Sequence, residues 1–507
     1  METQVLIIGA GPTGLVLALW LTRMGIRVRI VDKTKGPGTT SRATVFHARN
    51  LEFYHQLGID QKAIAGGIFM QDINLWTKGK KATHFSFGAA GKAISPYPYA
   101  LIFPQDKQEA LLIAELEASG VMVERETELL SYSDSPDGIN AVLSHNGQVS
   151  TVRALYLAGC DGAHSVVRKQ LKVDFVGGDY AHTFYVADVE CEGPVANGEL
   201  HAALDKADFF IAFPMKGAGN VRLIGTVKDK DISGGELTWD DVSHDVLSRM
   251  AVQVKRINWF STYRVHHRVA SRFKCGNVFL LGDAGHIHSP VGGQGMNTGI
   301  GDAVNLAWKL RNVINGWAHV SLLDTYETER IAFGRQLIKS TDRAFTFVTK
   351  QSRLADFVRL HIVPRLIPLL FRSAAMRRFF FRTMSQTGIK YPQSALSSGK
   401  AGKVKGGDRL PWTGDNFESL SALQWQLHCY GEPRPEIRDW CARHDIPLTI
   451  YPWNRAARQT GLKRNAIYVI RPDGHVGLAQ AKANVAEIDA YFKRIKNELK
   501  KPLFEGL

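Results

Sequence analysis

Three glycines near the start of the chain have a spacing that brings protein backbone close to a bound phosphate. Gly9, Gly11 and Gly14 directly follow the apolar residues 5–8, and an apolar helical pattern comes after them. In such a strand–turn–helix, the first glycine permits a tight turn, the second admits a pyrophosphate, and the third lets the helix lie close to the sheet. Asp32 ends the next expected strand, where an acid binds adenosine ribose hydroxyls. The pattern predicts a bound dinucleotide.

Three later stretches indicate which dinucleotide this is. Asp161 and Arg168 flank an expected strand-to-helix turn, which suits a pyrophosphate or a nicotinamide cofactor as well as an ordinary Asp-Gly turn. Asp283 ends another buried strand and is placed to accept hydrogen bonds from a polyol chain. Residues 291–302 are a loop of small residues that leads into a helix, and the free N–H groups there suit the negative edge of a reduced flavin. Together they favour FAD.

Two histidines in the same region raise the question of a metal site. His286 and His288 are two residues apart in a loop rich in Gly and Pro, and no third ligand is near them in the sequence. A structural or catalytic zinc site needs at least three protein ligands. We therefore predict no metal.

The chain resembles the single-component, FAD-dependent aromatic hydroxylases, the group that contains para-hydroxybenzoate hydroxylase and phenol hydroxylase. The matching motifs follow one another in the expected order over the first 330 residues. They are residues 9–14, Asp32, residues 41–43, residues 48–52, Pro104-Gln105 with Glu109, Asp161-Gly162 with Arg168, and residues 282–310, continued by residues 323–330.

This resemblance implies a set of cofactor contacts. The implied FAD-binding residues are Gly9, Gly11, Gly14, Asp32, Lys33, Arg42, Gln105, Asp161, Arg168, Asp283, Gly295, Met296 and Asn297. Arg42 and Arg168 are also candidates for a transient NADPH or NADH site. The chain has no second glycine fingerprint, which suits a family whose nicotinamide cofactor binds only briefly.

The resemblance further implies the reaction. NAD(P)H would reduce FAD, O2 would form a flavin C4a-hydroperoxide, and a phenolic or polyketide-like aromatic substrate would be hydroxylated. Pro290 and Gly293 in the flavin-edge loop and His47 are the candidate catalytic residues. His47 is either a base, since imidazole titrates near neutrality, or a loop histidine held by hydrogen bonds, which we favour. Tyr185, Phe209 and Phe213 either line the substrate site or belong to the core.

The expected fold is α/β with several units. A Rossmann-type FAD-binding domain takes residues 1–70, 102–172 and 273–345, and residues 71–101 and 173–272 form an inserted, mainly antiparallel substrate-binding sheet. Basic amphipathic helices occupy residues 346–398, with a linker at 400–407. Residues 399–507 resemble the thioredoxin-like domain of larger family members but contain no CxxC, so we expect a packing or oligomerisation module.

Composition limits the partners and the compartment. The formal net charge is +15, and much of it lies between residues 350 and 382, where apolar residues alternate with arginines at helical spacing. We expect helices that bury the apolar face; docking on an anionic membrane is the alternative, and nucleic acid is not expected because no recognition motif is present. No segment is apolar enough to span a membrane. Five scattered cysteines predict the reducing cytoplasm, and a homodimer stays open.

Other functions fit the same motifs. On this scaffold the reaction could also be epoxidation, oxidative ring opening or inactivation of an antibiotic. A flavin-binding redox sensor is the non-enzymatic alternative, and the complete flavin-edge loop argues against it.

Overall fold

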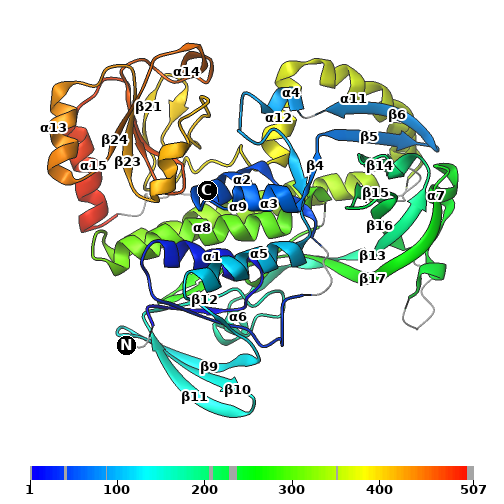
Figure 1. The fold of residues 1–507 in the computed structure, drawn as a ribbon, viewed down its shortest axis with the longest axis horizontal. Coiled ribbons are helices and arrows are strands. Elements are labelled where there is room, and N and C mark those ends of the chain that lie inside the picture. Colours follow the sequence, from blue (N-terminus) through cyan, green and yellow to red (C-terminus); the bar gives the residue numbers. More distant parts are fainter. Residues whose placement is uncertain are drawn as a thin grey trace.

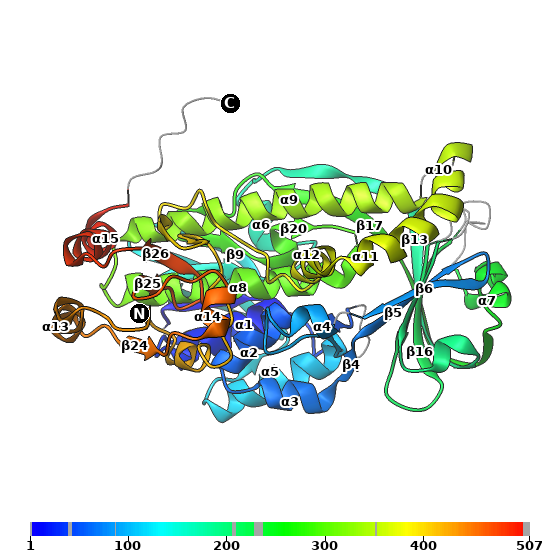
Figure 2. The same cartoon turned by 90° about the horizontal axis from the view of Figure 1, so that it is seen from above.

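A computed structural model describes residues 3–38, 43–86, 88–204, 209–227, 237–289, 291–349 and 352–499 (Figure 1). A central α/β layer lies between two other units. A large antiparallel sheet is at one end of this layer and a C-terminal α/β unit is at the other (Figure 2).

The central layer is built on a six-stranded sheet. Its strand order is β18 (Lys274–Cys275), β19 (Val278–Leu280), β12 (Tyr156–Gly159), β1 (Val5–Ile8), β2 (Val28–Val31) and β8 (Val123–Glu124). All neighbours are parallel except β18. β1 is apolar at every position and fully buried, as expected for a parallel strand that is covered on both faces.

Helices cover one face of this sheet and a small antiparallel sheet covers the other. The helices are α1 (Pro12–Arg23), α5 (Gln105–Ala118) and α8 (Gln294–Ile314), which pack against one another (Figure 1). The small sheet contains β9 (Thr127–Ser135), β10 (Gly138–His145) and β11 (Gln148–Ala154), with α6 (Val166–Gln170) beside it. Its residues Leu129 and Ile139 are buried in the same core as β1.

The large antiparallel sheet has eight strands. Their order is β20 (His286–Ile287), β17 (Gln253–Ala270), β13 (Phe175–Glu192), β16 (Asn220–Val227), β15 (Phe209–Pro214), β14 (Leu200–Leu204), β5 (Asp72–Thr77) and β6 (Lys80–Ser86), with α7 (Asp245–Arg249) at its rim. Neighbouring strands are antiparallel except β14 and β5, which are parallel. After β19 the chain leaves the parallel sheet and joins the edge of this one at β20. Residues 281–285 therefore cross the junction between the two sheets.

Short elements fill the space around this junction. A three-stranded sheet of β3 (Val45–Phe46), β7 (Ala100–Ile102) and β4 (Ile68–Met70) adjoins α2 (Ala48–Gln56), α3 (Asp60–Gly66) and α4 (Gly88–Gly91). Later in the chain come α9 (Asp324–Thr349), α10 (Arg353–Phe357), a π-helical turn (Val358–Ile362), α11 (Val363–Arg372) and α12 (Ala374–Met384). In the part of the chain that the structure describes, no helix has the length and apolar character needed to cross a membrane.

The C-terminal unit has its own six-stranded sheet. Its order is β22 (Val404–Lys405), β21 (Ser398–Ala401), β26 (Val476–Gln480), β25 (Ile467–Ile470), β23 (Gln426–Tyr430) and β24 (Leu448–Tyr451), with helices α13 (Pro435–His444), α14 (Arg455–Gln459) and α15 (Val485–Asn497). The prediction of a linker at residues 400–407 is wrong. β21 and β22 form a hairpin there, because β21 pairs in parallel with β26 and backbone hydrogen bonds outweigh the flexible composition.

Buried charges attach the C-terminal unit to the central layer. Arg471 donates two hydrogen bonds to Glu329 of α9, at 2.7 and 2.9 Å, and also pairs with Asp473. Lys309 of α8 lies 2.9 Å from Glu329, and all four side chains are buried. Burial alone would raise the pKa of Glu329, but Arg471 and Lys309 hold it below its usual range. A carboxylate between two cations fixes the unit in place.

A second cluster supports the same interface from α2. Arg409 of the C-terminal unit pairs with the buried Glu52, which also binds Arg49. Arg49 in turn donates to the backbone carbonyl of Asp473 at 2.5 Å. Two short segments of the C-terminal unit, around residues 407–409 and 471–474, therefore contain its docking residues.

We predict that Arg471→Met lowers the free energy of unfolding by about 3–5 kcal/mol, because Glu329 and Asp473 keep buried charges without their partner. Urea denaturation measures this change. Lys493→Met is the matched control: it breaks an exposed pair with Asp489 and should cost at most about 1 kcal/mol. Equal losses in the two variants would contradict the interpretation.

Candidate active site

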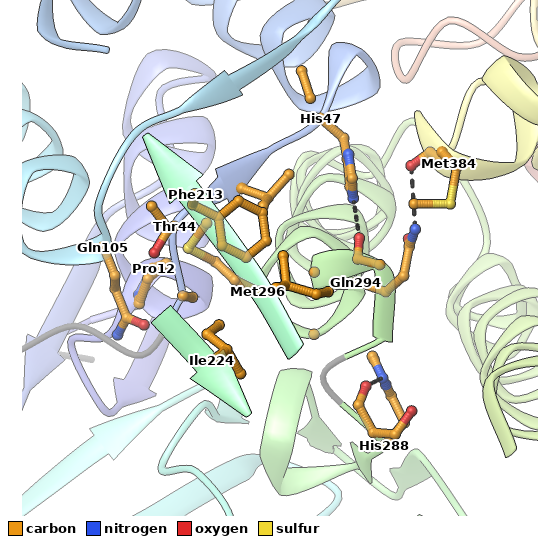
Figure 3. Close-up of a pocket in the computed structure, with 18 of the residues that line it drawn as sticks. Pro12, Thr44, His47, Gln105, Phe213, Ile224, His288, Gln294, Met296 and Met384 are labelled. Atoms are coloured by element: carbon orange, nitrogen blue, oxygen red, sulfur yellow. Dashed lines mark hydrogen bonds between the residues drawn. The ribbon is translucent and has the colours of Figure 1, made fainter. Parts of the chain in front are cut away.

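A cavity of about 760 Å³ lies at the junction of the two large sheets. Four groups of residues line it: the glycine loop after β1, the segment 43–47, the flavin-edge loop that precedes α8, and apolar side chains of the eight-stranded sheet and of α11 and α12 (Figure 3). Among the sequence-predicted residues, Gly11, Gln105, Asp283, Gly293, Gly295, Met296 and His47 line this cavity.

The geometry of the glycine loop matches the role expected for each glycine. A β-carbon on Gly14 would lie 2.0 Å from the carbonyl oxygen of Gly9, so only glycine lets α1 pack this closely. Gly9 has φ +102°, and a β-carbon there would lie 2.4 Å from the carbonyl oxygen of Cys160. A β-carbon on Gly11 would meet no protein atom within 4 Å. Gly11 therefore has open space beside it, as a ligand-facing position requires.

Asp32 follows β2 and faces the same loop. Its Oδ2 accepts a hydrogen bond from the backbone N–H of Ala10 at 2.7 Å, and its Oδ1 accepts one from that of Thr34 at 2.8 Å. Lys33 is exposed beside it. Arg125 was not predicted from the sequence as part of this site. Its Nη1 lies 3.8 Å from Asp32 Oδ1. The available signal was its place directly after β8, the neighbour of β2 in the sheet.

The flavin-edge loop is shaped by two left-handed glycines. Gly292 has φ +79° and Gly293 has φ +61°, and Gly293 starts α8 without any capping side chain. A β-carbon on Gly293 would lie 2.9 Å from Val45. The positive end of α8 is thus left for a ligand with negative charge, such as the pyrimidine edge of a reduced flavin. Pro290 lies outside the described residues.

Asn297 connects this loop to the segment 43–47. Its Nδ2 donates to the carbonyls of Val45 and Gly293 at 2.8 and 2.7 Å. Its Oδ1 accepts from the backbone N–H of His47 and from the side chain of Asn50, both at 2.8 Å. The side chain of Asn297 is therefore fully used in holding the loop.

Two acids in the junction have different environments. The side chain of Asp283 is exposed to the open space of the cavity, and the protein around this cavity, which limits its hydration, raises its pKa. Asp302 is completely buried and accepts hydrogen bonds from the N–H of Gly282, from His286 Nε2 and from Arg330 Nε, at 3.0, 2.7 and 2.6 Å. Burial alone would raise the pKa of Asp302, but the charge of Arg330 lowers it. Asp302 holds the backbone that carries Asp283.

Asp161 and Arg168 lie at the turn after β12. Asp161 Oδ2 accepts hydrogen bonds from the first two N–H groups of α6, at 2.7 and 3.1 Å, while its buried Oδ1 has no protein partner. Arg168 donates to the carbonyls of Ala284 and Ala163 at 2.8 and 2.7 Å, and lies over the ring of Phe175. The guanidinium of Arg168 is thus occupied by protein groups. Arg42 lies outside the described residues.

His47 is buried at the wall of the cavity. Its Nε2 lies 3.0 Å from the carbonyl oxygen of Gly292 and so carries the proton (Figure 3). Burial lowers the pKa of His47 to about 4, so the ring is neutral at neutral pH. This geometry supports the interpretation of His47 as a residue that holds the flavin-edge loop.

His288 also lines the cavity, and no role in the cofactor or substrate site was predicted for it from the sequence. Its Nδ1 donates to the carbonyl of Ser289 at 2.9 Å, which leaves the buried Nε2 as an acceptor without a protein partner (Figure 3). Burial lowers its pKa to about 4. His286 instead forms a hydrogen bond with Asp302, and the centres of the His286 and His288 rings are 6.4 Å apart. The signal in the sequence was the second histidine of the pair, which was considered only as a metal ligand.

Possible metal ligands come together elsewhere, at the edge of the eight-stranded sheet. Ligand atoms of Asp72, His84 and Glu199 lie within 4.8 Å of one another. Glu199 already accepts hydrogen bonds from Asn74 and Asn197, at 2.7 and 2.8 Å. We interpret this partly exposed group as a polar surface cluster.

The three aromatic residues considered as substrate contacts differ in position. Phe213 lines the cavity (Figure 3), whereas Tyr185 is buried in a separate core of the eight-stranded sheet. The side chain of Phe209 lies outside the described residues. Arg222, also missed in the sequence, joins this sheet to the site: it pairs with Asp188 through two bonds of 2.6 Å and donates to Thr44 at 2.7 Å.

The fold and the glycine loop define a dinucleotide-binding protein, and a large cavity adjoins that loop. The family model described as the FAD binding domain matches residues 2–341. The chain is 34% identical over 405 residues to a 6-methylpretetramide 4-monooxygenase of Streptomyces rimosus, covering 78% of this chain and 71% of the relative. It is 31% identical over 507 residues to a rifampicin monooxygenase of Rhodococcus hoagii, covering 97% and 98%.

A solved structure has the same fold. An anhydrotetracycline hydroxylase from Streptomyces rimosus superposes with a TM-score of 0.78 at 26% identity, covering 99% of this chain and all of the other. The chain belongs to the FAD binding domain family and is an FAD-dependent monooxygenase of the aromatic hydroxylase type. This confirms the resemblance seen in the sequence, the mixed α/β fold and the cofactor.

The residues present fit FAD. The open space beside Gly11 and the uncapped N-terminus of α8 adjoin the cavity, and Asp161, with its orphaned Oδ1, lies between two residues that line it, Cys160 and Gly162. Gly11 would adjoin the pyrophosphate, and Gly295 and Met296 the flavin ring.

We predict opposite effects of two alanines in the glycine loop. Gly11→Ala should fold with a nearly unchanged unfolding midpoint, because its β-carbon meets no protein atom, yet lose at least about tenfold in FAD affinity, because the pyrophosphate needs that space. Gly14→Ala should itself destabilise the protein, since its β-carbon clashes with Gly9. Thermal unfolding and flavin-fluorescence titration separate the two. Normal FAD affinity in Gly11→Ala would contradict the assignment.

We predict that His47→Gln keeps kcat within about threefold, because the amide can donate to the carbonyl of Gly292 in place of Nε2. A general base would cost about 100-fold or more. His47→Phe, which removes the donor, should weaken FAD binding. Steady-state kinetics of both variants decide between the two roles, and a collapse of kcat in His47→Gln would establish the base.

We also predict acid sensitivity from His47. Its pKa is about 4 in the folded protein against 6.5 for the free side chain, so the stability it contributes is full above pH 6.5 and is lost as the pH falls toward 4. The loss amounts to about 3 kcal/mol at 1.36 kcal/mol per pKa unit. Urea unfolding between pH 7 and pH 4 should therefore show a steeper decline in wild type than in His47→Gln. Parallel curves would contradict this.

Proposed function

We propose that this protein hydroxylates a large, apolar aromatic or polyketide-like substrate, using NAD(P)H and O2 with its FAD. One observation carries the proposal: a cavity of about 760 Å³ is continuous with the glycine loop and the flavin-edge loop. Cavities of several hundred Å³ with mostly apolar walls and a few polar groups are typical of sites for drug-sized ligands. The cavity is large enough for a flavin ring and a substrate side by side.

The relatives support this substrate class. Their names describe oxidation of 6-methylpretetramide, anhydrotetracycline, rifampicin and pentachlorophenol. The match to a rifampicin monooxygenase spans nearly the whole chain, as does the match to an anhydrotetracycline monooxygenase, so oxidation of an antibiotic is kept as the specific alternative.

The chain's own residues would orient the reactants and exclude water. Bound FAD would take a hydride from NAD(P)H and, once reduced, activate O2 at its C4a position. The N-terminus of α8 would stabilise the negative pyrimidine edge of the reduced flavin. Phe213, Ile224 and Met384 would exclude water from the reacting atoms.

The neutral His288 would fix the substrate or the ring edge. His288 lines the cavity, and its buried Nε2, which has no protein partner, would accept a hydrogen bond from a phenolic hydroxyl or a flavin N–H that reaches it. A hydroxyl held in this way is oriented and polarised without a full proton transfer. This role fits an active site in which His47 is occupied with the loop.

The reductant site remains a proposal. Arg168 is held by two backbone carbonyls, and Arg125 likewise donates to Thr34 and to the carbonyl of Gly36, so the exposed Lys33 next to Asp32 is better placed to meet a phosphate group from solvent. The choice between NADPH and NADH would then depend on this cation. The reaction would take place in the cytoplasm, where NAD(P)H is available.

We propose that the C-terminal unit is a thioredoxin-like packing module without redox function. Cys429 and Cys441 are buried, and burial raises the pKa of each thiol to about 11. A thiol with such a pKa is a poor nucleophile at neutral pH. The buried ion pairs with Glu329 and Glu52 support a fixed, structural role.

NAD(P)H oxidation tests the proposed function. We predict that the FAD-loaded enzyme oxidises NADPH or NADH slowly alone and at least about tenfold faster with a fitting substrate, because hydroxylases of this kind couple reduction to substrate binding. Polycyclic phenols, tetracycline precursors and rifamycins form the panel, and mass spectrometry should find a product heavier by one oxygen atom. No stimulation and no oxygenated product across the panel would contradict the proposal.

A further inference from the structure

Exposed apolar side chains are concentrated in one part of the surface. Fifteen large apolar side chains are exposed among the described residues, and seven of them lie between Leu354 and Phe379. Leu354 is 74% exposed and Leu369 is 59% exposed. Isolated exposed apolar residues are ordinary, but a contiguous group of this kind marks an interaction surface.

Four of these residues form one face of α11 and of the last residue of the π-helical turn before it. Ile362, Leu366, Leu369 and Leu370 are spaced i, i+4, i+7 and i+8, which places them on the same side of a helix. The opposite side faces the protein: Ile367 lines the cavity, and the ring of Phe371 lies 4.5 Å from that of Phe85 on β6. The expectation that the apolar residues face the core is right for this inner side and wrong for the outer side.

The outer face is also strongly basic. Residues 352–384 contain seven arginines and one acid, Asp356, which pairs with Arg359. Arg365 and Arg372 are exposed next to the apolar stripe. β6 packs beside α11 and adds the exposed Lys80 and Lys81 (Figure 2). Apolar residues flanked by arginines on an exposed helix are the pattern of a helix that lies in the interface of an anionic bilayer.

We propose that α10, α11 and the π-helical turn between them dock on an anionic membrane surface. The leucines of the outer face enter the acyl boundary, and the arginines contact lipid phosphates. Charge complementarity favours lipid over a protein partner: within residues 353–372, which the structure describes throughout, the one acid is Asp356, and it pairs with Arg359. Because the inner face of α11 lines the cavity, docking brings apolar compounds dissolved in the lipid next to the cavity wall.

Co-sedimentation of the FAD-loaded protein with vesicles tests this proposal. We expect binding to phosphatidylcholine vesicles that contain phosphatidylglycerol and little binding to phosphatidylcholine alone, with loss at high salt. The double variant Leu366→Glu/Leu369→Glu should reduce binding at least about tenfold, and Arg365→Gln/Arg372→Gln by about tenfold.

Matched controls place the same changes elsewhere. Leu130→Glu/Val149→Glu alters exposed apolar residues of the small antiparallel sheet, and Arg443→Gln/Lys496→Gln removes two exposed cations from the C-terminal unit. Both should bind vesicles like wild type, and all variants should keep their FAD content and unfolding midpoint.

Three results would overturn the proposal. The wild type could fail to bind anionic vesicles, or the controls could lose binding as much as the α11 variants. Alternatively, size-exclusion chromatography could show a wild-type dimer that becomes a monomer in Leu366→Glu/Leu369→Glu, which would make this face a contact between two copies of the chain.

Discussion

The buried carboxylate of Asp302 is the interaction on which the cofactor site depends. It holds the backbone of Gly282 at the start of the sheet junction, the ring of His286 at the edge of the antiparallel sheet, and the guanidinium of Arg330 on α9. Arg330 continues to Tyr391, 2.9 Å away, next to the C-terminal unit. A buried charge must be paired. The segments that carry Asp302, Gly282, His286 and Arg330 can therefore adopt only a narrow range of relative positions.

The second constraint is that polar and apolar side chains have separate roles around the site. Polar contacts are concentrated where the backbone has to be held: Asn297 at the flavin-edge loop, Arg222 between the antiparallel sheet and Thr44, and Glu329 under the C-terminal unit. The cavity between them is left mainly to apolar side chains. This arrangement surrounds a mainly apolar cavity with residues that are fixed by polar contacts, as is typical of sites for drug-sized ligands.

The cofactor-binding half of the site could be predicted from the sequence because its signals are local. The spacing of Gly9, Gly11 and Gly14 sets the geometry of one turn, and the structure shows the same close contacts. The interactions of Asp302, Arg222 and His288 could not be predicted, since their partners come from distant elements and depend on how the two sheets meet. The error at residues 400–407 has the same origin: composition favoured a linker, but pairing of β21 with β26 decided the structure.

The central claim is that this cavity brings reduced FAD, O2 and an aromatic substrate together so that oxygen is transferred to the substrate. Turnover of a substrate from the panel under O2 labelled with heavy oxygen, followed by mass spectrometry of the product, tests the claim most directly. The account predicts one labelled oxygen atom in each product molecule and none from water. Product oxygen that comes from water, or label found only in hydrogen peroxide, would contradict it.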